Sequence, residues 1–194
     1  MLKVMVAGCC CALLAAAPAA SRAQGGDYVP GSVEPSLETG IAFGGDRLAG
    51  EHAIVGGDNS LYAGNSAYVV FGPQFNFADS HWSLKAMGGI QHGFILSQVT
   101  SPTFTRYPLD LLLLDNRGDW HWGFGLSYHL NPKLRPQGDG PDFSFHNALG
   151  GVPEAQYQIF GIRYTHIRYT SSGACPEFCR YDGSTLGLYV NIVF

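Results

Sequence analysis

The chain of 194 residues is lightly charged, with 11 basic and 15 acidic residues and a formal net charge of −4 at pH 7. Only 13% of its residues are charged, whereas 26 are glycines and 13% are aromatic, which is unusual for a water-soluble domain. The acidic balance disfavours nucleic acid as a partner, because such binding depends on basic residues that contact phosphates. No apolar run after the N-terminal segment approaches the roughly 18 residues of a spanning helix, so a closed barrel is the expected way into lipid.

The N-terminus has the features of a secretory signal peptide. Lys3 supplies a positive charge, residues 4–20 form a short apolar run, and a small-x-small motif ends at Ala23. We therefore expect cleavage after Ala23, which makes residues 1–23 the signal peptide. A membrane anchor helix is the alternative, but this Ala-rich run is short and is interrupted by Pro18.

The five cysteines fall into two regions. Cys9, Cys10 and Cys11 lie in the expected signal peptide, and the lipobox-like stretch at Cys9 is not at the end of the apolar run, which argues against a lipoprotein. Cys175 and Cys179 remain in the mature chain, and an even pair in an exported protein predicts a disulfide. A metal site would need further ligands at suitable spacing, and the seven histidines are scattered. We expect neither a metal nor a cofactor.

Alternation of apolar and polar residues recurs along the mature chain and predicts β-strands. It is clearest in residues 185–194, where every second side chain is apolar and the chain ends on Phe194. Residues 120–130 repeat the pattern, with aromatic and leucine side chains on one face and Gly, Ser and His on the other. About ten residues suffice for a tilted strand to cross a bilayer, and aromatic residues near strand ends form the girdles of barrels. A half-buried strand of a soluble protein is the alternative.

Further alternating segments lie at residues 68–77, 82–94, 106–113 and 143–159. Because Pro153 cannot donate a hydrogen bond to a ladder, we expect a β-bulge there. Residues 37–43 and 51–55 are either two strands or one strand bent at Gly44-Gly45. We choose one bent strand, because an even number of strands is expected when both termini are periplasmic.

The predicted connections alternate in length along the chain. Those near residues 78–81, 115–119 and 160 are short, and those at 57–62, 96–102, 131–142 and 172–183 are longer. Short periplasmic turns and longer outer loops are typical of bacterial barrels. The sequence thus predicts an all-β, eight-stranded antiparallel up-and-down transmembrane β-barrel of a Gram-negative outer membrane. The expected units are a cleaved signal peptide (1–23), a short periplasmic segment (24–35) and the barrel (36–194).

Four stretches carry a family resemblance: residues 44–49, 107–112, 123–133 and 161–165. Through them the chain resembles the small uncharacterised outer-membrane β-barrel proteins of proteobacteria. The resemblance implies the location and the fold, but no activity. The strand that ends at Phe194 resembles the signal that such proteins present to the barrel assembly machinery. That machinery is therefore an expected partner, together with outer-membrane lipid and lipopolysaccharide.

A more distant resemblance is to lipid A 3-O-deacylases, which are also eight-stranded barrels and use a His-x-Ser pair on one strand. The nearest stretch here is residues 165–169, where Arg168 stands in place of the serine. The chain thus departs from the motif that defines this activity. His166 of the same stretch stays a weak catalytic candidate.

Two other pairs combine a hydroxyl with an imidazole, namely Ser127 with His129 and Ser144 with His146. Residues two apart on a strand share a face, and the hairpin between the strands would bring the pairs close together. Such a pair is a weak candidate for a nucleophile and its base. Asp142 is the nearby carboxylate that would orient the base. The simpler interpretation is that these side chains fill a small lumen.

The alternation places five charged residues inside the barrel: Lys85, Arg106, Asp110, Glu154 and Arg163. Eight strands leave an interior only wide enough for side chains, and charges there must pair or stay hydrated. We expect a salt-bridged plug, and the alternative is a narrow ion path.

His166, Arg168 and Arg180 are expected near the outer end of the last hairpin. They are candidates for contact with lipopolysaccharide phosphates, for which arginine is well suited, although exposed rim charge explains them equally well. The leading hypothesis is a non-enzymatic outer-membrane protein that is structural or interacts through its outer loops. An outer-membrane esterase and a small channel are the alternatives, because a barrel fold is compatible with many functions.

Overall fold

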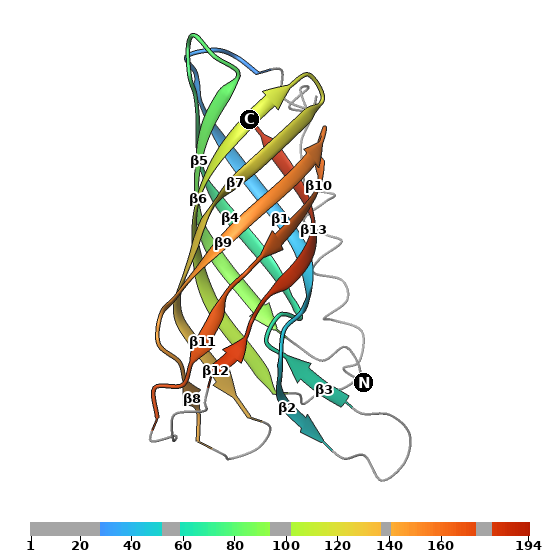
Figure 1. Ribbon diagram of the computed structural model, residues 1–194, viewed down its shortest axis with the longest axis vertical. Helices are drawn as coiled ribbons and strands as arrows, with labels where there is room; N and C mark the ends of the chain where they lie inside the picture. Colours follow the sequence, from blue (N-terminus) through green and yellow to red (C-terminus); the bar gives the residue numbers. More distant parts are fainter. Residues whose placement is uncertain (1–27, 52–58, 94–101, 137–140, 174–179) are drawn as a thin grey trace, which may run out of the picture.

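A computed structural model describes residues 28–51, 59–93, 102–136, 141–173 and 180–194 (Figure 1). The expected signal peptide and the cysteine pair Cys175 and Cys179 lie outside these ranges, so the cleavage and the disulfide stay predictions. In the described ranges no helix has the length and apolar character needed to cross a membrane.

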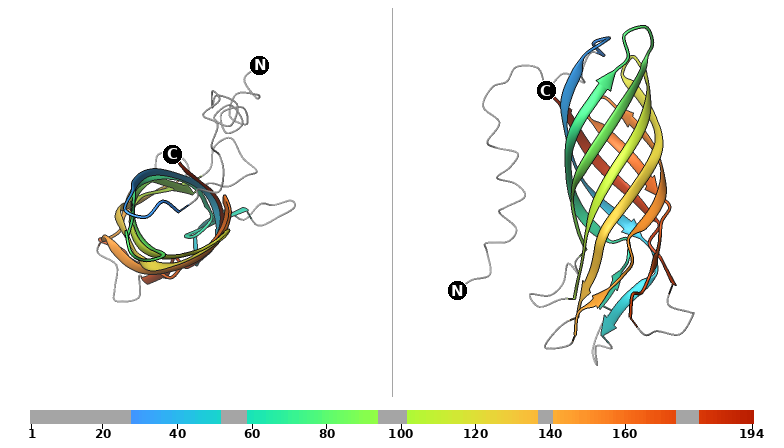
Figure 2. Two further views of the ribbon diagram at one scale, coloured as in Figure 1. Left: turned by 90° about the horizontal axis from the view of Figure 1, so that it is seen from above. Right: turned by 90° about the vertical axis from the view of Figure 1, so that its left-hand side faces the viewer.

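Eight long strands form one closed antiparallel barrel. They are β1 (Val33–Gly44), β4 (Ser66–Asn76), β5 (Trp82–Gly93), β6 (Thr103–Arg117), β7 (Trp120–Arg135), β9 (Ala148–Tyr157), β10 (Phe160–Thr165) and β13 (Thr185–Val193). The order around the sheet is β6-β5-β4-β1-β13-β10-β9-β7, and a further pairing of β6 with β7 closes the ring. Seen from above, the ribbon forms this ring (Figure 2). The predicted eight-stranded up-and-down barrel is confirmed.

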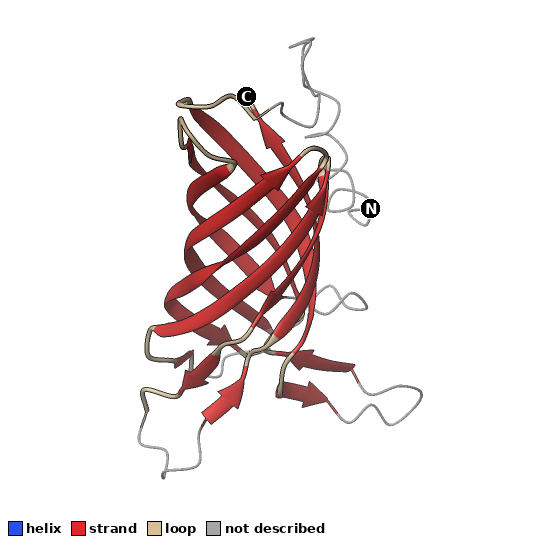
Figure 3. Ribbon diagram, turned by 45° about the horizontal axis from the view of Figure 1, so that its top comes forward, coloured by secondary structure: helices blue, strands red, loops and turns tan. Residues whose placement is uncertain are grey.

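Five short strands extend the barrel at one end (Figure 3). They are β2 (Arg47–Glu51), β3 (Asn59–Tyr62), β8 (Phe143–Ser144), β11 (Arg168–Thr170) and β12 (Arg180–Asp182). This end, at the bottom of Figure 1, is called the loop end. The opposite end, where β1 begins, β13 ends and the short turns lie, is called the terminal end.

Side chains alternate between the interior and the outer surface along each long strand. In β6, for example, burial alternates over the whole strand from Thr103 to Arg117. The outward side chains are largely apolar, and Phe124 and Leu188 are each 58% exposed. The predicted outward row that ends at Phe194 is also exposed at Leu186 and Leu188. The barrel therefore has an apolar outer surface around a partly polar interior.

Aromatic side chains gather on the outer surface at the terminal end. The rings of Trp120 and Trp122 stack with centroids 5.8 Å apart, and Tyr157 packs against Trp120 at 5.0 Å. Phe160 and Phe194 are exposed at the same end. The aromatic residues that the sequence pattern assigns to strand ends thus lie close together in the structure.

The first strand bends where Gly44 and Gly45 follow one another. Their φ angles are 131° and 77°, a region that side chains other than glycine rarely adopt. The strand does not continue in the barrel after this bend, because β2 pairs with β3 in a separate hairpin. The expected single long strand is therefore wrong: β1 ends at Gly44, and a turn leads from it into β2.

The β-bulge expected at Pro153 is absent. The register between β7 and β9 runs without a shift through Phe124 and Pro153. The missing N–H of Pro153 is accommodated on the side of β9 that faces β10. There the β9–β10 ladder stops at Glu154 and resumes only at the bridge between Gly151 and His166. Among the described barrel strands, the register shift lies instead between β6 and β7, next to Asn131, whose φ angle is 45°.

Candidate functional site

The interior of the barrel holds a group of paired charges that we call the central ion network. Its members are Glu38 from β1, Lys85 from β5, Asp110 from β6, Glu154 from β9 and Arg163 from β10. All five side chains are buried. The network therefore ties together five of the eight strands.

The two basic residues of the central ion network each contact more than one carboxylate. Lys85 Nζ lies 3.2 Å from Glu38 Oε2 and 2.9 Å from Glu154 Oε1. Arg163 lies 3.1 Å from Glu38, 2.9 Å from Asp110 and 2.6 Å from Glu154. Buried charges are costly unless they are paired and hydrogen-bonded, and this geometry meets both conditions.

Polar and aromatic side chains complete the coordination of the central ion network. The Tyr68 hydroxyl donates to Glu38 at 3.1 Å, and the Ser127 hydroxyl donates to Asp110 at 2.5 Å. The Tyr189 ring lies over Gly161, where a Cβ atom would come within 2.1 Å of the ring. Only glycine allows this close approach, so Gly161 lets the aromatic ring pack against the barrel wall.

Arg106, which we expected in the same plug, is also buried but does not join the central ion network. Its guanidinium donates to Gln91 Oε1 at 3.0 Å, to the Ala63 carbonyl at 2.7 Å and to Ser66 Oγ at 3.3 Å. It also lies over the Phe104 ring, with 4.9 Å to the centroid. Its hydrogen bonds within the described part of the chain all go to neutral groups, and it forms the boundary between the ion network and the loop end.

An apolar core lies beyond Arg106 and is called the loop-end cluster. Its buried members are Leu61, Ala63, Phe104, Leu134, Phe145, Ala148, Ile167 and Tyr169. Phe104 packs edge-on against both Phe145 and Tyr169, with centroids 5.5 and 5.3 Å apart. These side chains come from five strands and from the segments that join them. The cluster fills the interior at the loop end.

Polar side chains fill the interior at the terminal end. The Asn76 amide donates to Ser32 Oγ at 2.8 Å and to Glu34 Oε2 at 3.0 Å. The Ser83 hydroxyl donates to Asn76, and the Asn116 amide donates to Ser83 at 2.7 Å. The segment that precedes β1 crosses the opening of the ring in the view from above (Figure 2). Both ends of the lumen are thus occupied by protein.

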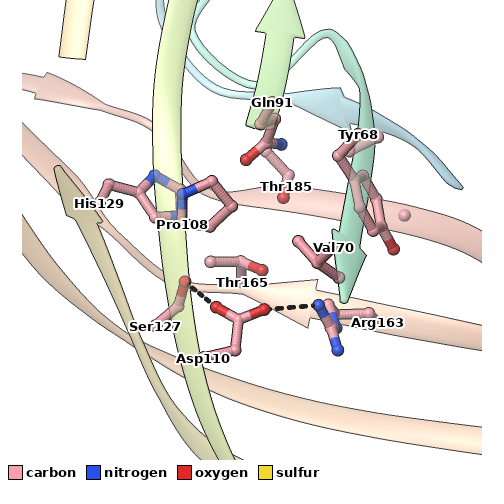
Figure 4. Close-up of a pocket in the computed structure, with 12 residues that line it drawn as sticks. Tyr68, Val70, Gln91, Pro108, Asp110, Ser127, His129, Arg163, Thr165 and Thr185 are labelled. Carbon is pink, nitrogen blue, oxygen red and sulfur yellow. Dashed lines mark hydrogen bonds and ion pairs between the residues drawn. The ribbon is translucent and has the colours of Figure 1, made fainter. Parts of the chain in front are cut away.

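Besides a cavity of about 20 Å³ among the polar side chains of the terminal end, a second small cavity lies between Asp110 of the central ion network and Gln91, which accepts a hydrogen bond from Arg106 (Figure 4). Its volume is about 20 Å³, which is room for about one water molecule. Asp110 projects into it between Ser127 and Arg163, while His129 lies on another side (Figure 4). Among the described residues, no buried polar side-chain atom lacks a hydrogen-bond partner. The interior is therefore closely filled and its polar groups are satisfied.

Neither of the two predicted serine–histidine pairs forms a nucleophile with its base. Ser127 donates to Asp110, whereas the His129 ring lies 2.6 Å from the Tyr169 hydroxyl. Ser144 and His146 point outward and are exposed at the loop end. The hairpin brings Ala148 opposite His129, so the two predicted pairs do not meet.

His166, Arg168 and Arg180 are exposed on the outer surface at the loop end. His166 Nδ1 lies 2.9 Å from Ser184 Oγ. Arg168 stands opposite Asp182, and Arg180 stands opposite Thr170, in the β11–β12 hairpin. The three residues predicted to contact lipopolysaccharide thus lie close to one hairpin, and the acidic residue Asp182 lies among them.

Two carboxylates of the loop end are held ionised by hydrogen bonds. Lys133 donates to Asp142 at 2.7 Å and lowers the pKa of that carboxyl group. Ser184 donates to Asp182 and lowers its pKa in the same way, with the backbone amide at 2.8 Å. These contacts order the loop end without involving the lumen.

Sequence reasoning missed Glu38, although a signal for it was present. Ser36, Glu38 and Ala42 are buried, and they alternate with the outward residues Thr39 and Ile41. The loop-end cluster was also missed, because its members lie near strand ends where the alternation is interrupted. Among the described residues, no three His, Cys, Asp or Glu side chains are grouped so as to hold a metal ion.

The chain matches no protein-family model, no curated relative and no solved structure. The chain is an eight-stranded antiparallel β-barrel with an apolar outer surface and a filled lumen.

Proposed function

We propose that this protein is an integral outer-membrane β-barrel with a filled lumen, and that it acts through structure or through contacts of its loop end. The observation that carries the proposal is the apolar outer surface of a closed ring. Large apolar side chains such as Phe71, Leu109, Leu126 and Ile162 stand outward on different strands, each about half exposed. In water such a surface would be an aggregation liability, whereas in a bilayer it faces acyl chains.

The closed ring supports the same proposal, because a bilayer core offers no water to satisfy backbone groups. Each barrel strand pairs on both sides, and the β6–β7 pairing leaves no free edge. Closed barrels are one of two backbone arrangements that can span lipid. The terminal end would then face the periplasm and the loop end the outer side, as in other bacterial barrels.

The filled lumen supports a structural or interactive role over a channel. Three layers occupy it, namely the polar residues of the terminal end, the central ion network and the loop-end cluster. The cavity of about 20 Å³ between two of these layers is too small for a hydrated ion path. The geometry supports the esterase alternative no better, since Ser127 and His129 each bond to other groups.

Membrane location is tested by expressing the full chain in a Gram-negative host and separating the membranes by density. We expect the protein in the outer-membrane fraction, with a gel band that shifts when the sample is boiled. Recovery in a soluble fraction, or a band that does not respond to boiling, would contradict the proposal.

Two further measurements test the functional part. In planar bilayers we expect no steady conductance steps, and regular single-channel steps would overturn the filled lumen. The mass of lipid A in the host should not change on expression. Loss of an acyl chain that His129→Ala or His166→Ala abolishes would overturn the non-enzymatic role.

A further inference from the structure

The small cavity that Asp110 borders, drawn in Figure 4, is called the Asp110 cavity. Its volume of about 20 Å³ corresponds to about one water molecule. Cavities that stay dry in proteins are lined by apolar side chains. Val70 is an apolar part of this lining, but the Asp110 carboxylate and the hydroxyl groups of Thr165 and Thr185 also line it. The lining therefore offers hydrogen-bond partners to a small polar molecule.

Two threonine side chains border the Asp110 cavity without a partner in the protein. Thr165 on β10 and Thr185 on β13 stand directly opposite each other, and both are buried. Neither hydroxyl group forms a hydrogen bond with a described residue. Every fully enclosed polar side-chain atom of the described residues does have a partner, so these two hydroxyl groups are not fully enclosed. The Asp110 cavity is the space that both of them line.

Asp110 accepts fewer hydrogen bonds than the other carboxylates of the central ion network. From the described residues Glu38 accepts three, and Glu154 also accepts three. Asp110 accepts two, one from Ser127 and one from Arg163. A carboxylate has lone pairs for about four hydrogen bonds, so Asp110 can accept at least one more. Its side chain projects into the cavity, where a further donor would lie (Figure 4).

The charges around the Asp110 cavity favour a neutral occupant. Arg163 borders the cavity, and so does Gln91, which accepts a hydrogen bond from Arg106. A cation would therefore meet two guanidinium groups nearby, and an anion would meet the carboxylate of Asp110. Water carries no charge and can donate and accept hydrogen bonds at once, so it suits a lining that combines a carboxylate with hydroxyl groups.

We propose that the Asp110 cavity is a binding site for one water molecule, which donates to Asp110 and hydrogen-bonds to Thr165 and Thr185. The water molecule gives Asp110 its third hydrogen bond. Through Thr185 it also links the central ion network to β13, a strand that contributes no charged member to the network. The inference goes beyond the proposed function and does not depend on it, because the cavity lies inside the barrel.

The direct test is a high-resolution crystal structure of the purified protein in detergent. We expect one spherical density peak about 2.5–3.0 Å from a carboxylate oxygen of Asp110 and from the hydroxyl group of Thr165 or Thr185. A cavity without such a peak would overturn the inference. Crystals grown in rubidium bromide test for an ion. Anomalous scattering from rubidium or bromide at this position would show that the site takes an ion, and the assignment to water would be wrong.

A substitution distinguishes a hydrated cavity from a dry one by the sign of its effect. Thr165→Val removes the hydroxyl group and nearly keeps the shape of the side chain. If a water molecule is bound, the variant loses a hydrogen bond, and the ratio of unfolded to folded protein in urea should rise about two- to tenfold. In a dry cavity the same change removes a hydroxyl group that has no partner. A ratio that falls or stays the same would therefore contradict the site.

Thr170→Val is the matched control, because Thr170 is exposed on β11 and does not line the cavity. We expect it to change the ratio by less than about twofold. If Thr170→Val raises the ratio as much as Thr165→Val does, the effect does not come from the cavity and the inference fails. Each variant is first tested for folding by its gel shift on boiling. If Thr165→Val does not fold, Thr185→Val carries the same expectation.

Discussion

We call the part of the eight long strands that surrounds the central ion network the barrel body. The barrel body and the loop end have opposite polarity, although some of the same strands run through both. On β7, Trp122 and Phe124 stand outward in the barrel body, and Ser127 points inward. Past the irregularity next to Asn131, the inward residue is Leu134 and the outward residues are basic. The central ion network therefore has its charges inside, whereas the loop-end cluster has its apolar side chains inside.

This contrast is the one expected if the protein has the proposed membrane location, because the chain would then pass from one solvent into another. In lipid the favourable arrangement exposes apolar side chains and satisfies polar ones in the interior, whereas in water the hydrophobic effect reverses the two. The loop-end cluster resembles the core of a small soluble domain, and the barrel body does not. Substitutions at matched positions in the two regions should therefore have different effects.

The largest effect is expected inside the barrel body. Glu154→Ala removes a carboxylate that contacts both Lys85 and Arg163, so each of these buried basic groups loses an ion pair. Loss of one partner of a buried pair costs about 3–5 kcal/mol of the free energy of unfolding. Urea unfolding in vesicles, followed by tryptophan fluorescence, measures it. The control Asp115→Ala removes a partly exposed carboxylate that contacts Arg117, and it should cost less than about 1 kcal/mol. Similar losses for the two variants would contradict the network's role.

In the loop-end cluster, truncation should act as it does in a soluble core. Ile167 is 1% exposed, and Ile167→Ala should lower the free energy of unfolding by about 2–5 kcal/mol. Ile162→Ala is the matched change on the apolar outer surface, where lipid can fill the space, and its effect should be much smaller. The comparison fails if both variants lose the same stability in vesicles.

A new charge on the outer surface should distinguish the two regions directly. Leu188→Arg places a charge on the outer surface of the barrel body, which costs about 2–4 kcal/mol near the middle of a bilayer. Thr170→Arg places the same side chain on the outer surface of the loop end, where the like charge of Arg180 opposite it should limit the loss in the free energy of unfolding to less than about 1 kcal/mol. Equal effects of these two variants would show that both positions face the same solvent.

The smallest effect is expected from the ionisation of the loop end. Because hydrogen bonds from Ser184 lower the pKa of Asp182 in the folded protein, this carboxylate stabilises the fold above the unfolded pKa of about 3.9. That contribution is lost as the pH falls through the lowered pKa. Asp182→Asn should thus lower the free energy of unfolding at pH 7 by less than about 1 kcal/mol, and the difference should vanish in acid. A difference that does not change with pH would exclude this role.

The barrel body could be predicted from the sequence because each strand there has one environment on each face. Alternation alone pointed Lys85, Asp110 and Glu154 inward and the row that ends at Phe194 outward. Alternation cannot predict which inward side chains contact one another, because contacts inside a lumen join strands that are not neighbours in the sheet. Arg106 was therefore placed in the ion network, although its hydrogen bonds go to Gln91, Ala63 and Ser66.

The loop end could not be predicted in the same way, because the phase of alternation changes there. Phe145 and Ala148 are both buried although they are three residues apart, so Ser144 and His146 face outward. An unbroken strand would have pointed these two residues inward. The β-bulge predicted at Pro153 was wrong for a related reason. A proline can lie beside a gap in the β9–β10 ladder without any register shift in the β7–β9 ladder.

The span of the central ion network along the chain bears on how the protein is assembled. Glu38 and Arg163 are separated by 125 residues and meet only when the first and last parts of the chain are side by side. Until then Arg163 has fewer carboxylates around it, so its ion pairs stabilise an incomplete sheet less than the closed barrel. Ring closure carries a loop-closure entropy that such long-range contacts must offset. The charges thus favour an all-or-none final step and disfavour partly closed intermediates.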